Sequence, residues 1–217
     1  MKRNVLARRA ASAALAACMM FSLSAPALAA STDALLQQST AAKSAVSVLD
    51  MQNDISESAT TMDLCNGRII VSVENGQQYA EQKNIKQPIS DLVVTTNNVE
   101  TNNTLTIRGG DSTAAKVTLS NVNINASGAA VSVSGNVELV IAGTNTLHSG
   151  TDHAGVEKAD DNGTLTISGS GTLNAYGGQG GAGIGSGSQK GCSNIVIESG
   201  TIIAHGGQWG AGIGSGN

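Results

Sequence analysis

Apolar and polar side chains alternate along short stretches of the chain from about residue 104 onward. TLTIR at 104–108, KVTL at 116–119 and GTLTIS at 163–168 place an apolar residue at every second position, with threonine between. A period of two is that of a β-strand with one face buried. The pattern predicts short strands with an apolar inner face and a hydroxyl-rich outer face, whose Thr and Asn residues mostly form strands and turns.

The chain also contains an internal repeat near its end. Residues 171–187 read GTLNAYGGQGGAGIGSG and residues 200–216 read GTIIAHGGQWGAGIGSG, so that 13 of 17 positions are identical at a spacing of 29. One such unit cannot bury its apolar face alone and must lie against a neighbour. The repeat therefore predicts a stack of similar units.

Weaker copies of this unit appear upstream when the apolar positions are aligned, which gives four rungs. The first strand of each rung supplies two apolar columns, Val117, Leu139, Leu165 and Ile195, then Leu119, Ile141, Ile167 and Ile197. The second strand supplies an apolar and a small-residue column, Ile124, Leu147, Leu173 and Ile202, then Ala126, Ser149, Ala175 and Ala204. A third, short strand supplies Val131, Val156, Ile184 and Ile213.

Three short strands in each turn of about 22 to 30 residues predict an all-β fold, a right-handed parallel β-helix with coils about 4.8 Å apart. Less regular N-terminal coils precede the four rungs, with strands expected at 68–73 and 91–96. The segment between these strands is predicted to be a loop that covers the N-terminal edge of the solenoid.

The N-terminus has the features of a secretory signal peptide. Four basic residues precede a largely apolar stretch at 10–23, and Ala27-Leu28-Ala29 is a small-residue cleavage site. The alternative is a lipoprotein signal that would anchor the chain through Cys18. We expect a signal peptide at 1–30, a polar linker or short helix at 31–62, and a secreted or cell-surface β-helix domain at 63–217 of bacterial extracellular type.

The end of the chain lies inside a glycine-rich arc, at Gly214-Ser215-Gly216-Asn217, without a polar capping unit. Repeat arrays normally end in an atypical unit. We therefore expect either a domain that is truncated at its C-terminus or a last coil that frays.

Charge and cysteine content narrow the classes of partner. Without the leader, 8 of the 12 basic residues remain against 16 acidic ones, a net charge of 8 − 16 = −8. No basic stripe is present to neutralise phosphate, which disfavours nucleic acid, and no second apolar stretch has the length of a membrane span. Cys65 and Cys192 could form a bridge in an oxidising exterior or remain two isolated thiols, and their spacing is not that of a zinc site.

The region 116–217 resembles bacterial secreted right-handed β-helix proteins of the carbohydrate-binding or adhesin-like type. The resemblance rests on NVELVIAGTNTL, on AGVEKADDNGTLTISGSGTLNAYGG and on the doubled GGQxGAGIGSG. It implies an architecture like that of pectate lyases, and a polysaccharide ligand that some members bind with the help of calcium. Fold alone does not fix the activity.

Two groups of residues are candidates for binding. In the rung alignment Tyr176 stacks on His205, with Trp209 four residues further on and glutamines at matching repeat positions, Gln179 and Gln208. Aromatic rings can face the C–H side of a sugar while amides bond its hydroxyls. The alternative is structural: Tyr176 covers a turn and Trp209 packs against the next coil.

The second group is acidic and lies in the connection 151–162. Asp152, Asp160 and Asp161 could supply oxygen ligands for calcium and bridge a uronate carboxylate. The alternative is a solvated turn before the next strand.

Catalysis and nucleotide binding are disfavoured by what the chain lacks. GGQGGAGIG resembles a dinucleotide fingerprint but no long helix follows it, so the glycines are expected to form tight corners. Arg108, Lys116 and Lys158 are the bases near the rungs, and no set of acids recurs on one face. We expect a non-catalytic polysaccharide-binding protein without an organic cofactor; a structural adhesin or surface stalk is the alternative, a pectate-lyase-like enzyme is less favoured, and protein partners or self-assembly remain open.

Overall fold

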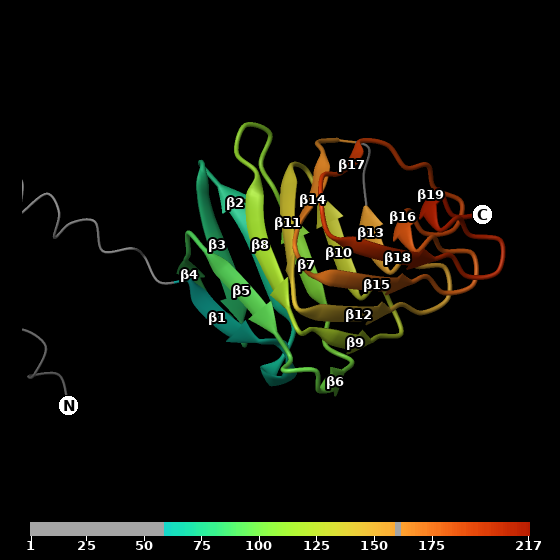
Figure 1. The fold of residues 1–217 in the computed structure, drawn as a ribbon. Helices are drawn as coiled ribbons and strands as arrows, with labels where there is room; N and C mark the ends of the chain where they lie inside the picture. Colours follow the sequence, from blue (N-terminus) through green and yellow to red (C-terminus); the bar gives the residue numbers. More distant parts are fainter. Residues whose placement is uncertain (1–58, 159–161) are drawn as a thin grey trace, which may run out of the picture. The chain divides into compact units, whose positions relative to one another are not determined.

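The computed structural model describes residues 59–158 and 162–217. Within them the chain is all-β and forms a parallel β-solenoid of about five turns, as the sequence predicts (Figure 1). The predicted signal peptide at 1–30 and nearly all of the predicted linker at 31–62 lie outside the described residues. None of the described helices is long and apolar enough to cross a membrane.

Three sheets run along the solenoid, and each of the five complete turns adds one strand to each of them, whereas the first, incomplete turn has no strand in the second sheet. The first sheet consists of β1 (Thr60–Asp63), β5 (Leu92–Thr95), β8 (Ala115–Ser120), β11 (Val137–Ala142), β14 (Leu165–Gly169) and β17 (Ile195–Ile197). The second consists of β6 (Glu100–Thr101), β9 (Asn123–Asn125), β12 (Thr144–His148), β15 (Thr172–Tyr176) and β18 (Thr201–His205). The third contains β2 (Ile69–Glu74), β7 (Leu105–Arg108), β10 (Val131–Ser134), β13 (Val156–Lys158), β16 (Ile184–Gly185) and β19 (Ile213–Gly214).

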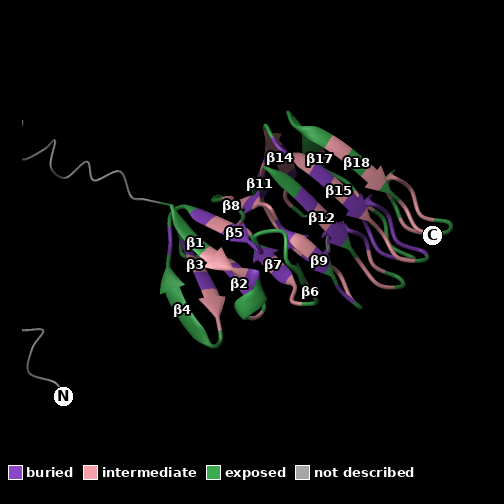
Figure 2. Ribbon diagram, turned by 60° about the horizontal axis from the view of Figure 1, so that its bottom comes forward, coloured by how far each residue is buried: buried purple, intermediate pink, exposed green. Residues whose placement is uncertain are grey.

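We number the coils by their strands. Coil 1 contains β1, the short 3-10 helix η1 (Leu64–Asn66) and β2; coils 2 to 6 begin with β5, β8, β11, β14 and β17. The core lies between the three sheets and consists of inward-facing Val, Ile, Leu and Ala residues, nearly all of which are buried in every coil except the last. Figure 2 shows this alternation as buried bands along β12 and β15.

The column predicted for the third sheet is confirmed. Val131 pairs with Val156, Val156 with Ile184, and Ile184 with Ile213. The column also continues upstream to Leu105 and Ile69.

The predicted columns in the other two sheets are wrong between coils 4 and 5, where the register differs by two residues. Leu139 lies beside Ile167 rather than Leu165, and Leu147 lies beside Ala175 rather than Leu173. A shift of two residues keeps the same side chains inward, so an alternating pattern cannot detect it.

Two inward positions that are not apolar caused this error. Gly169 lies opposite Ile141, and Asn145 lies opposite Leu173, so an alignment of apolar residues skips both. Asn145 is fully buried, and its amide Oδ1 accepts from the Val122 N–H while Nδ2 donates to the carbonyls of Ala142 and Thr172. A satisfied amide can therefore occupy a core column at a corner between strands.

The predicted loop at the N-terminal edge is in fact two strands, β3 (Gln77–Gln82) and β4 (Ile85–Pro88). They pair antiparallel with β2 and with each other, and so extend the third sheet beyond β2. The first reversal is at Asn75-Gly76, with φ values of 52° and 79°, which is a strong hairpin signal in the sequence. The expected cover of the edge is present, although its structure is a meander rather than a loop.

Candidate functional site

A ladder of three stacked rings follows the outer face of the second sheet. His148, Tyr176 and His205 occupy one register column at the ends of β12, β15 and β18. The ring centroids of His148 and Tyr176 are 4.3 Å apart, those of Tyr176 and His205 are 5.0 Å apart, and the interplanar angles are 3° and 6°. The predicted stacking of Tyr176 on His205 is confirmed.

His148 was missed at the level of the sequence. The alignment that paired Leu147 with Leu173 placed His148 beside Asn174, one pleat away from Tyr176. The correct register, which is set around Asn145, brings it onto the ladder. The alternation of apolar and polar residues alone could not have placed His148 beside Tyr176, because alternation does not fix the register.

The stacking decides which ring surfaces a ligand can reach. Both faces of Tyr176 are covered by imidazoles, so its ring edge and hydroxyl remain for contact with a ligand. The two histidines are exposed and Tyr176 is half-buried. Ring stacking of this kind contributes about 0.5–1.5 kcal/mol per pair, so the ladder also stabilises the sheet.

A corner of the solenoid beside the ladder carries the two glutamines and the tryptophan. Gln179 Nε2 lies 3.4 Å from Gln208 Oε1, and both side chains are exposed. Trp209 is 65% exposed, so the alternative that it packs against a further coil is not realised within residues 59–158 and 162–217. Its indole is free to meet a ligand.

Trp209 is held in a left-handed backbone conformation. Its φ is 70°, and the preceding coil has Gly180 at this corner with a φ of 80°. The register follows from the Gly180 N–H, which donates to the Gln208 carbonyl. A non-glycine residue in this region costs about 1–2 kcal/mol, and this cost makes Trp209 a functional candidate.

The rest of this face is a polar grid. One outward column consists of Thr144, Thr172 and Thr201, and the next consists of Asn123, Thr146, Asn174 and Ile203. Hydroxyl and amide groups thus lie in rows beside the ladder, and Ile203 is an apolar member of an otherwise polar column.

Of the three predicted calcium ligands, Asp152 lies within the described residues. Asp152 is exposed, has a φ of 66°, and its carbonyl accepts from the Ser188 N–H. Asp160 and Asp161 lie outside the described residues. Among the residues that the structure describes, no group of three or more His, Cys, Asp or Glu side chains could hold a metal ion.

The connection 151–162 contains two buried charged residues that the sequence did not reveal. Glu157 and Lys158 lie in β13, so the interpretation of this stretch as a solvated turn is wrong for them. Glu157 Oε2 is 2.8 Å from His153 Nδ1 and accepts from the Ala154 N–H, and Lys190 Nζ lies 3.8 Å from Oε1. Lys158 Nζ donates to the Asn162 carbonyl at 3.0 Å.

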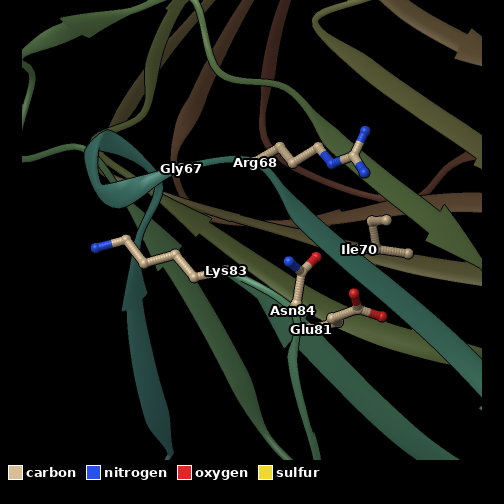
Figure 3. A pocket seen from close by; sticks show the side chains of 6 residues that line it. All are labelled: Gly67, Arg68, Ile70, Glu81, Lys83 and Asn84. Carbon is tan, nitrogen blue, oxygen red and sulfur yellow. The ribbon is translucent and has the colours of Figure 1, made fainter.

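The two cysteines and the pocket near the N-terminal end do not bring reactive side chains together. Among the residues that the structure describes, no disulfide joins Cys65 to Cys192. A pocket between Gly67 and Asn84 is lined by Arg68, Glu81 and Lys83, but Figure 3 shows the Arg68 and Lys83 side chains extending in different directions.

Comparison with protein-family models, with curated proteins and with solved structures found no match for this chain.

Proposed function

We propose that this protein is a secreted, non-catalytic carbohydrate-binding β-helix protein whose ligand is an acidic or cell-wall polysaccharide. The observation that carries the proposal is an exposed tryptophan, held in a strained backbone conformation, next to paired glutamines and a ladder of ring edges. This combination of one apolar plane with several polar groups suits the two sides of a sugar ring.

Each group has a distinct role in this proposal. The Trp209 indole packs against the C–H face of a sugar, as aromatic rings with a large apolar surface do. The amides of Gln179 and Gln208 both donate and accept, and so can bond neighbouring hydroxyls. Because stacking covers both ring faces of Tyr176, this residue contacts the sugar through its hydroxyl. His205 is stacked on one face only, so it contacts the sugar through a ring nitrogen and its outer ring face.

Calcium is part of the proposal because both the protein and an acidic polysaccharide are negatively charged. The chain without its leader has a net charge of −8 from 8 basic and 16 acidic residues, so an anionic polymer would be repelled on average. A divalent cation held by Asp152, Asp160 and Asp161 would bridge protein and uronate carboxylates, since calcium prefers oxygen ligands.

The test is retention on a panel of pectic, cellulosic and host-derived polysaccharides, with calcium and then with chelator, using the chain without residues 1–30. Trp209→Ala is expected to weaken binding about tenfold or more. Tyr176→Phe, which keeps the stack and removes the hydroxyl, is expected to weaken it several-fold, by about 1 kcal/mol. Tyr79→Phe, at the other end of the solenoid, is the matched control and should change nothing.

Three outcomes contradict the proposal. Retention on no glycan removes the binding function, retention that is unaffected by Trp209→Ala removes this site, and release of unsaturated or shortened product removes the non-catalytic assignment. Calcium-independent retention would contradict only the role of Asp152, Asp160 and Asp161.

A second candidate function is a structural adhesin or surface stalk. It is supported by the apolar surface of the last coil, where Val196 and Ile203 are exposed. This candidate predicts protein partners or assembly, and indifference of function to Trp209→Ala.

A further inference from the structure

The three histidines of the chain differ in whether the protein supplies a negative partner for them. His153 Nδ1 lies 2.8 Å from Glu157 Oε2, so a positive charge on His153 is balanced inside the protein. In the part of the chain that the structure describes, neither His148 nor His205 forms an ion pair. A positive charge on either of these two rings therefore remains for a ligand to neutralise.

Few ionisable groups share the outer face of the second sheet with these two histidines. On the described strands of this sheet the others are Glu100 on β6 and Tyr176 between the two histidines. Glu100 lies two strands away from β12, and its Oε1 is 3.5 Å from Asn125 Nδ2. No described strand of this sheet contains lysine or arginine, so histidine is the source of positive charge on the face.

The connections next to these strands add three further ionisable residues. Asp152 and His153 lie in the connection that follows β12, and Glu198 precedes β18. His205 ends β18, so Glu198 and His205 are at opposite ends of that strand. The carboxylates near the ladder thus belong to its surroundings and do not pair with its rings.

The ladder fixes where the two histidine charges stand. His148 and His205 flank Tyr176 in one register column, with nearly parallel rings at centroid distances of 4.3 and 5.0 Å. Stacking covers ring faces, whereas imidazole nitrogens lie on the ring edge, so a ligand on the outer face can reach them. Holding these groups in place beforehand lowers the entropy cost of binding.

The charge of this face depends on pH, but the charge of a uronate polymer does not. An imidazole takes up its proton between about pH 5 and 8. Carboxyl groups of ordinary acidity are ionised throughout that range. Acidification therefore adds positive charge to the ladder while the polymer stays negative.

We infer that His148 and His205, in their protonated form, make the site select a carboxylated polysaccharide over a neutral one. The inference rests on the proposed function and adds the source of its specificity. A polymer that lies along the ladder places its repeated carboxylates beside the two imidazoles, with the Tyr176 hydroxyl between them. Since the protonated rings attract the carboxylates, binding strengthens as pH falls and weakens as pH rises.

A pair of polymers that differ in charge alone tests this specificity. Binding of the chain without residues 1–30 to polygalacturonate and to its methyl ester is measured at about pH 5 and pH 8, the two ends of the imidazole range. Calcium is kept constant. Polygalacturonate is expected to bind about five- to tenfold tighter at the lower pH, as two exposed charge pairs allow. The methyl ester should bind equally at both.

Variants assign the pH effect to residues. His148→Gln and His205→Gln should each leave about a two- to threefold effect, because one charge pair remains, and the double variant should show none. His153→Gln is the matched control and should keep the full effect, since Glu157 already balances the charge of His153. Circular dichroism checks that each variant is folded.

A second measurement follows from linkage and needs no variant. If the polymer binds the protonated rings more tightly, the bound polymer must in turn make these rings keep their protons to higher pH. In an NMR titration with an oligogalacturonate, the transitions of His148 and His205 should therefore move to higher pH. That of His153 should stay where it is.

The inference is overturned by polygalacturonate binding that is equal at the two pH values, by an equal pH effect with the methyl ester, or by a pH effect that survives in the double variant. In these cases the protein still binds a glycan, so the proposed function stands. Binding to neither polymer and to no glycan of the panel removes the proposed function, and the inference with it.

Discussion

The same core column is buried in the first described coil and exposed in the last one. Ile69 stands at the first position of the column that ends with Ile213, and both belong to terminal coils. Ile69 is fully buried because β3 and β4 extend the sheet beyond β2, whereas Ile213 is 50% exposed. The difference shows that burial in a solenoid depends on whether another layer follows, not on the residue or its strand.

The two ends also differ in polar character. The strands β3 and β4 have exposed or half-buried Glu, Lys and Gln residues and end at Pro88, features that discourage edge pairing. The strands β17 to β19 have none of these residue types. One end is closed to further strands by its sequence, and the other is not.

The largest expected effect comes from truncating the shared column at each end. Ile69→Ala should lower the free energy of unfolding by about 2–5 kcal/mol, because it leaves a cavity in a closed core. Ile213→Ala should cost about 1 kcal/mol or less in the monomer, because half of its surface is already in water. Urea unfolding of the dilute protein measures both, with Ile184→Ala as a control expected to resemble Ile69→Ala; equal costs at the two ends would contradict the comparison.

A smaller effect is expected from paired glycines of the third sheet. Gly185 and Gly214 have φ values of 144° and 129°, so alanine is strained at either position, by about 1–3 kcal/mol. At Gly185 an added Cβ would also lie 1.8 Å from the Gly214 carbonyl oxygen, whereas at Gly214 its nearest contact is 3.8 Å away. Gly185→Ala should therefore destabilise more and expose β19 to proteolysis, and Gly128→Ala, which has open space, is the control.

At Trp209, replacement by glycine is expected to give a more stable protein than replacement by alanine. Glycine accepts the left-handed conformation without strain, so Trp209→Gly should be more stable than Trp209→Ala by about 1 kcal/mol. Both variants remove the indole, so the difference between their thermal stabilities reports the cost of the left-handed backbone conformation. If the alanine variant were equally stable or more stable, this corner would not be held in the conformation described.

The smallest expected effect is the loss of one ion pair on acidification, at the N-terminal end where β4 covers the solenoid. The Lys86 ammonium, and then the Ser72 hydroxyl, lower the pKa of Glu74 below its ordinary value by hydrogen bonding. A lowered folded pKa means that the pair stabilises the protein above the ordinary Glu pKa and loses this contribution as pH falls through the lowered value. The protection factors of β4 amides, which correct for the slower intrinsic exchange at low pH, should therefore fall on acidification, and Glu74→Gln should show low protection of β4 at all pH values without affecting β18.

The apolar column of the third sheet was predicted correctly because its strands are short and flanked by small residues that recur at fixed places. Ala154-Gly155 and Ala182-Gly183 precede the column residue in successive coils and leave one plausible alignment. In the other sheets the strands are longer and alternate regularly, so a shift by two residues preserves every apolar contact. The turn that sets the register is stabilised by the Asn145 side chain, and such a hydrogen bond has no periodic signature.

The candidate site was predicted in part for the same reason. Tyr176 and His205 lie in the near-identical repeat and were matched, whereas His148 lies across the misaligned boundary. Glu157 and Lys158 were taken for a polar connection because charged residues are rarely fully buried without partners, and their partners come from His153, Ala154 and Asn162. The hairpin at Asn75-Gly76 could have been predicted from those two residues.

The near-identity of coils 5 and 6 has a consequence for how such a chain can change over generations. Because each unit binds the next through the same backbone groups, an in-frame duplication of one unit would add a layer without altering any existing contact. The layer gained would also carry its own ring and its own corner residue. The length of the ladder and the number of corner side chains can therefore change together in whole steps, through gene rearrangement rather than through many separate point mutations.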